Sequence, residues 1–177
     1  MRIGRHKTEI ELASGTNPAA TIQEARRDDL NHILALQKAC YRQEAEIYGD
    51  YEIPPLLQTA ASIIADFEHQ VFLKLQAGER IIGSVRGQTD NGTCKIGRLI
   101  VHEDFQNQGW GTQLMRAIEE RFSEVKRYEL FTGHRSDKNL TLYRKLGYTE
   151  CRRERVSSRL EIIFLEKANQ SLQAPLP

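Results

Sequence analysis

The residues best suited to chemistry form a glycine-containing turn, Gln106-Asn107-Gln108-Gly109-Trp110-Gly111-Thr112. It follows a segment with strand character and precedes one whose apolar residues recur at helical spacing. The start of a helix presents unpaired amide N–H groups and partial positive charge, and both suit phosphate oxygens. Gly109 and Gly111 have no Cβ atom, so the backbone can approach a pyrophosphate closely. Neutral side-chain donors at the turn are Gln106, Gln108 and Thr112.

Two common phosphate-binding motifs are excluded by the spacing of these residues. No Gly-Lys-Ser/Thr follows, as a Walker loop requires, and the third glycine of the dinucleotide fingerprint is missing. A tight turn whose small residues serve packing explains the segment equally well. Trp110 favours packing against neighbouring structure, since Trp is mostly buried, although its ring is also placed to touch a ligand.

A second informative segment runs from Asn139 to Tyr148 and reads N-L-T-L-Y-R-K-L-G-Y. Asn139 and Tyr143 are four residues apart, so they share one face of a predicted helix. Gly147 stands where a left-handed residue ends a helix. Asn139 also suits an ordinary first-turn position, and Tyr143 also suits a core position with its hydroxyl satisfied.

Together these segments resemble motifs A and B of the GCN5-related N-acetyltransferase (GNAT) superfamily. Gln106, Gly109 and Gly111 match the Q-x-x-G-x-G of motif A, and the segment from Asn139 to Tyr148 resembles motif B. One predicted helix and one predicted strand separate them, as in the family. The specific motifs cover residues 96–148, and the order of elements extends the resemblance over residues 22–167.

The resemblance implies acetyl-CoA as acyl donor, no metal, and a small-molecule or peptide amine as acceptor, which attacks directly in a ternary complex. The strand before motif A is expected to splay from the next parallel strand and pair its backbone with the pantetheine arm. A backbone N–H of Ile100 or Val101 is expected to stabilise the oxyanion. The implied cofactor-binding residues are Leu99, Ile100, Val101, Gln106, Asn107, Gln108, Gly109, Trp110, Gly111, Thr112 and Asn139.

The implied catalytic residues are Tyr143 and Glu44. Tyr143 matches the general acid that protonates the departing thiolate, and a phenol with a pKa of about 10 is protonated at neutral pH. Some relatives place a Glu base on the strand before motif A, where this chain has Lys95, Gly97 and Arg98. Glu44, Glu46 and Glu52 are candidates at the end of the first helix and in the loop after it, and we select Glu44. A solvated surface carboxylate and a water relay remain alternatives.

The composition of the chain limits the number of domains and disfavours nucleic-acid, metal and membrane binding. The 177 residues suffice for one domain, and 25 Lys plus Arg against 24 Asp plus Glu leave no global field for nucleic acid. The cysteines Cys40, Cys94 and Cys151 form no C-x-x-C pair, so we expect reduced thiols and no metal. No signal-like or membrane-spanning apolar run is present, which favours a cytoplasmic protein without membrane contact. Edge strands make a homodimer possible.

The order of the expected strands and helices, which must position these residues, indicates a single α/β domain. We expect a GNAT-like fold with a mixed, mostly antiparallel twisted sheet of about seven strands and helices on both faces. Residues 1–18 are expected to form a loosely docked arm, 19–167 the acetyltransferase domain, and 168–177 a tail. Strands are predicted at residues 20–25, 71–76, 80–87, 93–101, 128–132, 148–156 and 159–167. Helices are predicted from Asp28 or Asp29, around Ile63 to Phe67 after a chain break at Pro54-Pro55, over 109–122, and from Ser136 or Asp137 to Leu146. A hairpin turn is predicted at Asp90-Asn91-Gly92.

Two other functions are compatible with the sequence. One is a non-catalytic acyl-CoA-binding regulatory module that keeps the fold, which the unclear base favours. The other is an unrelated phosphate-binding domain in which both motif matches are chance.

Overall fold

The computed structural model describes residues 19–172, so the predicted arm at residues 1–18 and the second half of the predicted tail, residues 173–177, lie outside the described residues. The strands of the described part are β1 (Ala20–Glu24), β2 (Val71–Ala77), β3 (Arg80–Asp90), β4 (Thr93–Val101), β5 (Arg127–Gly133), β6 (Thr149–Arg155) and β7 (Glu161–Ala168). Its α-helices are α1 (Leu30–Tyr48), α2 (Pro54–Leu57), α3 (Ala60–Phe67), α4 (Trp110–Arg121) and α5 (Asp137–Lys145). Short 3-10 turns lie at Arg27–Asp29, Glu103–Phe105 and Gln170–Leu172.

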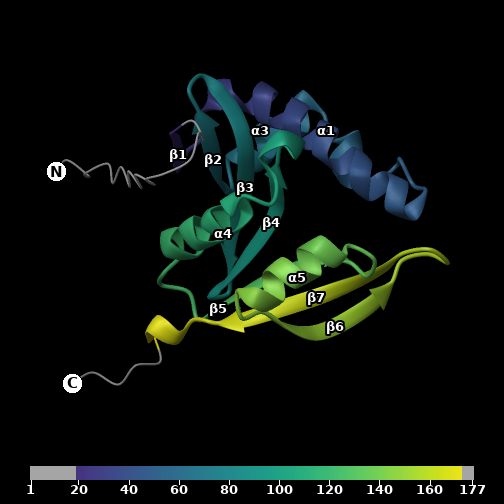
Figure 1. Ribbon diagram of the computed structural model, residues 1–177. Coiled ribbons are helices and arrows are strands. Elements are labelled where there is room, and N and C mark those ends of the chain that lie inside the picture. The colour runs from purple at the N-terminus through teal and green to yellow at the C-terminus, as the bar shows by residue number, and fades with distance from the viewer. Residues whose placement is uncertain (1–18, 173–177) are drawn as a thin grey trace.

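The seven strands form one mixed sheet in the order β1-β2-β3-β4-β5-β7-β6 (Figure 1). β4 and β5 are parallel, and the other neighbouring pairs are antiparallel. The crossover between the parallel strands is α4, as a parallel connection requires. The predicted fold class, a mixed and mostly antiparallel sheet in a single domain, is confirmed.

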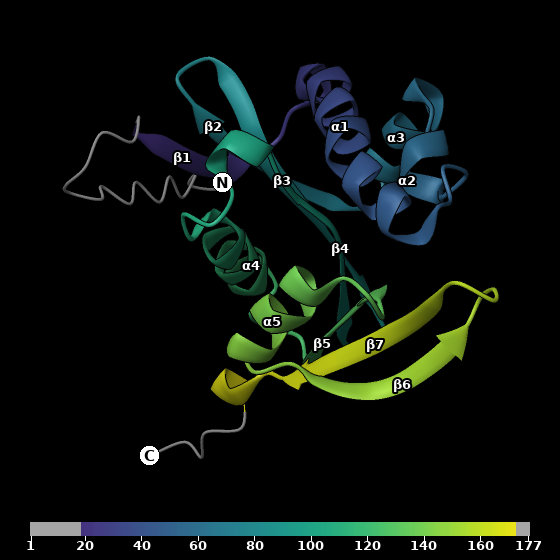
Figure 2. The same cartoon turned by 45° about the vertical axis from the view of Figure 1, so that its right-hand side comes forward.

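Helices cover both faces of the sheet and bury two separate apolar clusters. On one face α1 and α3 pack Leu30, Ile33 and Ile63 against Phe72 of β2. On the other face α4 and α5 enclose the larger cluster, which includes Leu114, Met115, Ile118, Leu140 and Tyr143. Figure 2 shows α1, α2 and α3 grouped on one side of the strands, with α4 and α5 on the other.

The helix and hairpin signals in the sequence have clear structural counterparts. Gly49 ends α1 in the left-handed conformation (φ 63°). The β3–β4 hairpin turns at Asn91 and Gly92, whose φ values of 49° and 77° suit a primed turn. The predicted chain break at Pro54-Pro55 is instead the start of the short helix α2, because proline is preorganised for a first helical turn.

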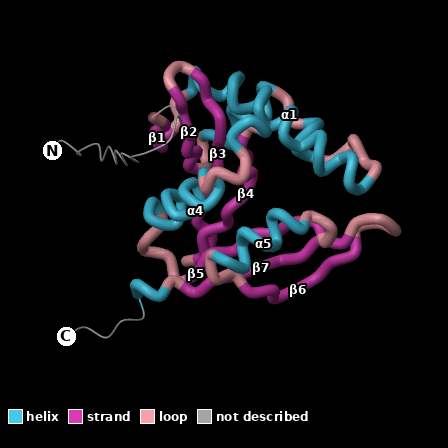
Figure 3. Tube along the Cα trace, in the orientation of Figure 1, coloured by secondary structure: helices cyan, strands magenta, loops and turns pink. Residues whose placement is uncertain are grey.

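The parallel pair β4–β5 is joined over only a short stretch. The register pairs Thr93, Cys94 and Lys95 with Arg127, Tyr128 and Glu129, while both strands continue well beyond (Figure 3). A bulge accompanies the divergence: Gly97 lies opposite Arg86 and Ile100 lies opposite Ser84, so β4 has one extra residue. The splay expected from the family resemblance is therefore confirmed.

Candidate active site

The opening between β4 and β5 exposes the backbone of the last β4 residues. Ile100 is buried, and half-buried Leu99 and Val101 pack against the core cluster, as expected for their side chains. The Val101 carbonyl accepts a hydrogen bond from Gln106 Nε2 at 3.0 Å and lies 3.5 Å from Cys40 Sγ. The β5-facing side of this segment is where a ligand can add backbone hydrogen bonds as a further strand would.

The glycine turn after β4 is open to solvent and ends in the N-terminus of α4. Gly109 is the N-cap, with φ 85°, and exposed Asn107 has φ 60°. The first amide of α4 that bonds back to the turn is that of Gln113, which donates to Gly109 O at 3.1 Å. The amides of Trp110, Gly111 and Thr112 therefore come before the first hydrogen bond within α4, and they point toward the turn.

The two glycines of the turn have different roles. A Cβ atom added to Gly109 meets no described atom within 4 Å, so the space above it is free for a ligand. A Cβ atom added to Gly111 lies 3.3 Å from Leu142 Cδ2, so Gly111 permits close packing of α4 on α5. Packing thus explains Gly111, and phosphate binding at Gly109 stays a prediction.

Polar side chains of the turn brace the loop in this structure. Gln106 donates to Val101 O, as above, and Gln108 Nε2 donates to Asp104 O at 3.1 Å. Trp110 is buried at 7% exposure, and its Nε1 has no hydrogen-bond partner among the described residues. Its ring packs in the core, as the sequence favoured, while its amide belongs to the turn.

Tyr143 lies on the inner face of α5, near the opening between β4 and β5. It is buried at 6% exposure, and its ring centroid lies 6.1 Å from that of Tyr148. Burial raises the pKa of the Tyr143 phenol above its ordinary value, and the nearby Tyr41 and Glu44 act in the same direction. The hydroxyl is therefore protonated throughout the neutral range, as a proton donor must be.

Glu44 comes from α1 and meets the start of α5. Its carboxylate accepts a hydrogen bond from Ser136 Oγ at 2.6 Å and one from Asn139 Nδ2 at 3.3 Å. Asn139 Nδ2 also lies 3.4 Å from Thr132 Oγ1 at the end of β5. The other two predicted carboxylates, Glu46 and Glu52, are exposed. The structure thus brings Glu44, Asn139 and Tyr143 into one cluster.

Two further tyrosines of α1 belong to this cluster and were missed from the sequence. Tyr41 is one turn before Glu44, and burial raises the pKa of its phenol. Tyr48 is one turn after Glu44, and its hydroxyl accepts the Arg135 N–H at 2.7 Å. Gly133 permits this contact, since a Cβ atom there would lie 2.2 Å from the Tyr48 hydroxyl. The sequence feature that could have revealed these two tyrosines is the helical spacing of four polar residues along one face of α1, namely Gln37, Tyr41, Glu44 and Tyr48.

A buried arginine on β3 holds the helices of this face in place. Arg86 is 2% exposed; it donates to Gln37 Oε1 at 2.6 Å and to Asp66 Oδ2 at 3.1 Å. Its guanidinium also lies 4.3 Å from the ring centroid of Phe72. Burial lowers the pKa of Arg86 to about 10, and the positive charge of Arg98 adds to this shift. Arg86 therefore ties α1 and α3 to the sheet, and it was also missed from the sequence.

Comparison with protein-family models matches residues 39–168 to the acetyltransferase (GNAT) domain. The chain belongs to the GNAT acetyltransferase family. The matched range contains β4, the glycine turn, α5 and the part of α1 that carries Glu44. The family resemblance found in the two sequence motifs is thereby confirmed over residues 39–168.

Solved acetyltransferase structures share the fold of this GNAT domain at low sequence identity. The ribosomal-protein-S18-alanine N-acetyltransferase from Escherichia coli aligns with a TM-score of 0.70 and 16% identity, over 84% of this chain and 93% of that one. An N-acetyltransferase from Staphylococcus aureus Mu50 gives 0.68 and 17%, over 85% and 98%. PaiA N-acetyltransferase from Thermoplasma acidophilum, in complex with coenzyme A, gives 0.63 and 16%, over 84% and 98%.

A curated relative with a longer chain is the UPF0157 protein YqkA of Bacillus subtilis (strain 168). It is 28% identical to this GNAT domain over 116 residues, which cover 66% of this chain. The chain spans about a third of the length of that relative, since the match covers 33% of it.

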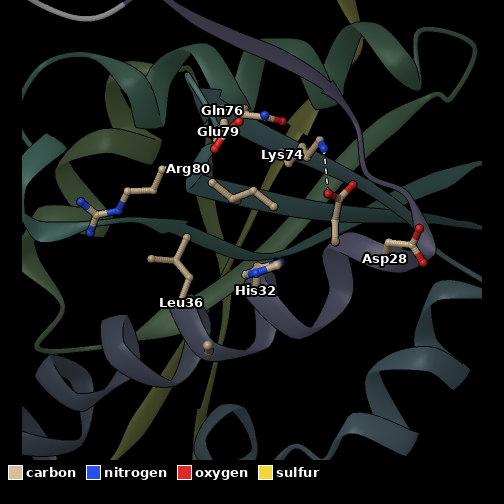
Figure 4. Close-up of a pocket in the computed structure, with 10 residues that line it drawn as sticks. Asp28, His32, Leu36, Lys74, Gln76, Glu79 and Arg80 are labelled. Atoms are coloured by element: carbon tan, nitrogen blue, oxygen red, sulfur yellow. Dashed lines mark hydrogen bonds and ion pairs between the residues drawn. The ribbon is translucent and has the colours of Figure 1, made fainter.

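Two surface cavities of the GNAT domain lie along α1, and Tyr48 of the Tyr143 cluster lines the smaller one. One, of about 690 Å³, lies between the start of α1 and the β2–β3 hairpin (Figure 4). Charged side chains of both signs line it, and Lys74 Nζ is paired with Asp29 Oδ1 at 2.8 Å. A smaller one, of about 240 Å³, lies where Tyr48 at the end of α1 faces residues 157–160 between β6 and β7.

Membrane-spanning and metal-binding features are absent from the part of the chain that the structure describes. None of the helices within residues 19–172 is long and apolar enough to cross a bilayer. The same residues contain no group of three or more His, Cys, Asp or Glu side chains that could hold a metal ion.

Proposed function

We propose that this GNAT domain is an N-acetyltransferase that transfers an acetyl group from acetyl-CoA to the amine of an acceptor by direct attack in a ternary complex. The observation that carries this proposal is the meeting of a buried phenol, Tyr143, and a half-buried carboxylate, Glu44, beside the opening between β4 and β5. A proton donor and a proton acceptor are the two groups that such a transfer requires.

The donor region, which we define as residues 99–112, suits acetyl-CoA. Its turn offers unpaired helix-start amides to the pyrophosphate, with free space above Gly109. The backbone of Leu99, Ile100 and Val101 lies along the opening where the pantetheine arm can pair. The related Thermoplasma PaiA structure contains coenzyme A, which supports the same class of cosubstrate here.

The reaction follows from the placement of the two groups. Glu44 takes a proton from the acceptor ammonium, and Ser136 and Asn139 hold its carboxylate in position. The neutral amine then attacks the thioester carbonyl, whose oxygen gains negative charge near the backbone N–H groups of Ile100 and Val101. As the carbon–sulfur bond breaks, Tyr143 gives its proton to the thiolate. The nitrogen of the new amide still carries one surplus proton, which passes to the Tyr143 phenolate and restores it, while Glu44 releases its own proton to solvent.

The experiment is a thiol-release assay with purified protein, acetyl-CoA and a panel of amines, combined with mass spectrometry of the products. We expect release of coenzyme A in equal amount with the acetylated amine. Tyr143→Phe should lower kcat by a factor of about 100 to 10,000, while the Kd for acetyl-CoA stays unchanged by calorimetry.

The matched control is Tyr148→Phe, which removes another buried hydroxyl of the same core. That hydroxyl donates to Glu119 Oε1 at 2.8 Å, away from Glu44, so kcat should be retained. Binding of acetyl-CoA without turnover of any amine would instead favour a non-catalytic acyl-CoA-binding module. Failure to bind acetyl-CoA would contradict both functions.

A further inference from the structure

Arg98 stands at the bulge of β4 in an uncommon backbone conformation. Its φ is 53°, in the left-handed region that residues with a side chain rarely adopt. Its half-buried guanidinium lies 5.8 Å from the ring centroid of Tyr41, one helical turn before Glu44. Strained backbone that a fold retains is concentrated at functional sites. Arg98 therefore belongs to the wall that faces α1, beside the Glu44 cluster.

The charge of Arg98 has no anionic partner within the described chain. None of the ion pairs formed by residues 19–172 includes it. Its charged neighbour on β3 is Arg86, a second cation whose pKa it depresses. Asp66 is engaged by Arg86, and Glu44 is engaged by Ser136 and Asn139. A partly buried cation ordinarily has a carboxylate beside it, so the missing anion points to a ligand.

Building on the proposed function, we infer that the acceptor is an amine that also carries a carboxylate, and that Arg98 binds this carboxylate while Glu44 receives the ammonium proton. Tyr41 lies under the Arg98 guanidinium, and Glu44 follows Tyr41 by three residues on α1. Residues at this spacing are neighbours on one face of a helix, so Arg98 and Glu44 both lie beside Tyr41 and can contact two groups of one small acceptor. The guanidinium fork suits bidentate binding of a carboxylate.

The same arrangement disfavours acceptors that carry only positive charge. A second ammonium of a polyamine would stand near both Arg98 and Arg86, where like charges repel in a site of reduced dielectric. An amine without an anionic group would leave the Arg98 guanidinium with the Tyr41 hydroxyl as a hydrogen-bond partner and with no anion to balance its charge. Arg98 is thus a specificity-determining residue for the acceptor, and it takes no part in proton transfer.

The test uses matched acceptors with the full chain and acetyl-CoA. The panel contains the L-amino acids, the corresponding amino acid amides, spermidine and O-phosphoethanolamine, and kcat and KM are measured for each. We expect kcat/KM for a preferred amino acid to exceed that for its amide by a factor of about 30 or more. A preference for O-phosphoethanolamine over every amino acid would overturn the assignment of a carboxylate.

Variants at position 98 separate recognition from folding. Arg98→Gly removes the guanidinium and relieves the positive φ, so the protein should stay folded while the acceptor KM rises by a factor of about 30 and the acid–amide preference disappears. Arg98→Lys should recover part of the preference. Lys95→Gln, on the exposed part of the same strand, is the control and should change neither quantity.

The possible failures are distinguishable. Equal kcat/KM values for amino acids and their amides contradict the carboxylate inference and leave the acetyltransferase function intact. A rise in the KM for acetyl-CoA, instead of the acceptor KM, in Arg98→Gly would also overturn the inference. Absence of turnover with every amine contradicts the proposed function itself.

Discussion

The donor region and the region that faces it from α1 are constructed in different ways. The donor region, residues 99–112, depends on backbone: a bulge, a strand that diverges from its neighbour, and a left-handed glycine before α4. The acceptor region, which we define as Gln37, Tyr41, Glu44, Arg86 and Arg98, depends on side chains from α1, β3 and β4. Backbone groups are the same for most residue types, so the donor region tolerates many side-chain substitutions. The acceptor region depends on individual side chains, so each substitution there alters the groups that a ligand would meet.

This difference predicts that substitution of a single side chain lowers activity or stability more in the acceptor region than in the donor region. The hydrogen bonds of Glu44 reach the start of α5 across 92 and 95 residues of sequence, whereas those that Gln106 and Gln108 donate to Val101 and Asp104 span 5 and 4 residues. Four substitutions or conditions test the contrast, and they follow in order of expected effect.

Arg86→Met should lower the free energy of unfolding by about 3 kcal/mol, because it removes a buried guanidinium that hydrogen-bonds to buried Gln37 and pairs with half-buried Asp66. Gln37 and Asp66 then lose their shared donor. Urea unfolding measures the change. The control is Arg127→Met, whose guanidinium is 51% exposed and should cost less than about 1 kcal/mol. Equal losses in the two variants would show that the buried network does not stabilise the acceptor region.

Glu44→Gln should lower kcat by a factor of about 100 without changing the Kd for acetyl-CoA, because the amide cannot accept the ammonium proton. The amide oxygen can still accept the Ser136 hydrogen bond, so the fold should be preserved. The exposed neighbour provides the matched control, Glu46→Gln. An unchanged kcat in Glu44→Gln would assign the proton transfer to a water relay.

Gly109→Ala should weaken acetyl-CoA binding about tenfold, because the added Cβ atom enters the space left for the ligand. The left-handed φ of this position should separately lower the stability of the fold by about 1–2 kcal/mol. Gly92→Ala is matched to it, with φ 77° and no described atom within 4 Å of its added Cβ. Calorimetry should detect weaker binding only in Gly109→Ala, and thermal unfolding should show a similar small loss in both. Equal Kd values would place the pyrophosphate elsewhere.

Alkaline pH should have the smallest effect, and it should act on the larger apolar cluster, which contains Tyr128 and packs against the donor region. Burial raises the pKa of Tyr128 to about 12, so its phenol stays protonated in the folded state when the unfolded chain ionises near pH 10. The free energy of unfolding should therefore be constant at neutral pH and decrease as pH rises above about 9. Urea unfolding at several pH values tests this, with Tyr128→Phe expected to decrease less steeply. Tyr51→Phe, at an exposed position, should match the wild type.

Short-range signals explain which parts of the structure could be predicted from sequence. The hairpin at Asn91 and Gly92 and the end of α1 near Gly49 are set by residues adjacent in the chain, and the glycine turn before α4 is likewise local. The four-residue α2 was mistaken for a simple break because proline both ends and begins helices. Arg86 and Arg98 could not be predicted, since an arginine in a strand is ordinarily a surface residue.

The brief pairing of β4 with β5 has a mechanical consequence. Strands β1 to β4 and strands β5 to β7 meet through three aligned residue pairs, helped by bridges such as that from Tyr48 to Arg135. The sheet thus consists of two halves, which are paired directly only at one end of β4 and β5. A pantetheine arm bound between the two halves would form hydrogen bonds where β4 and β5 form none with each other. Binding of the acyl donor should therefore make the domain more rigid. It should slow amide hydrogen exchange even in strands that do not contact the donor.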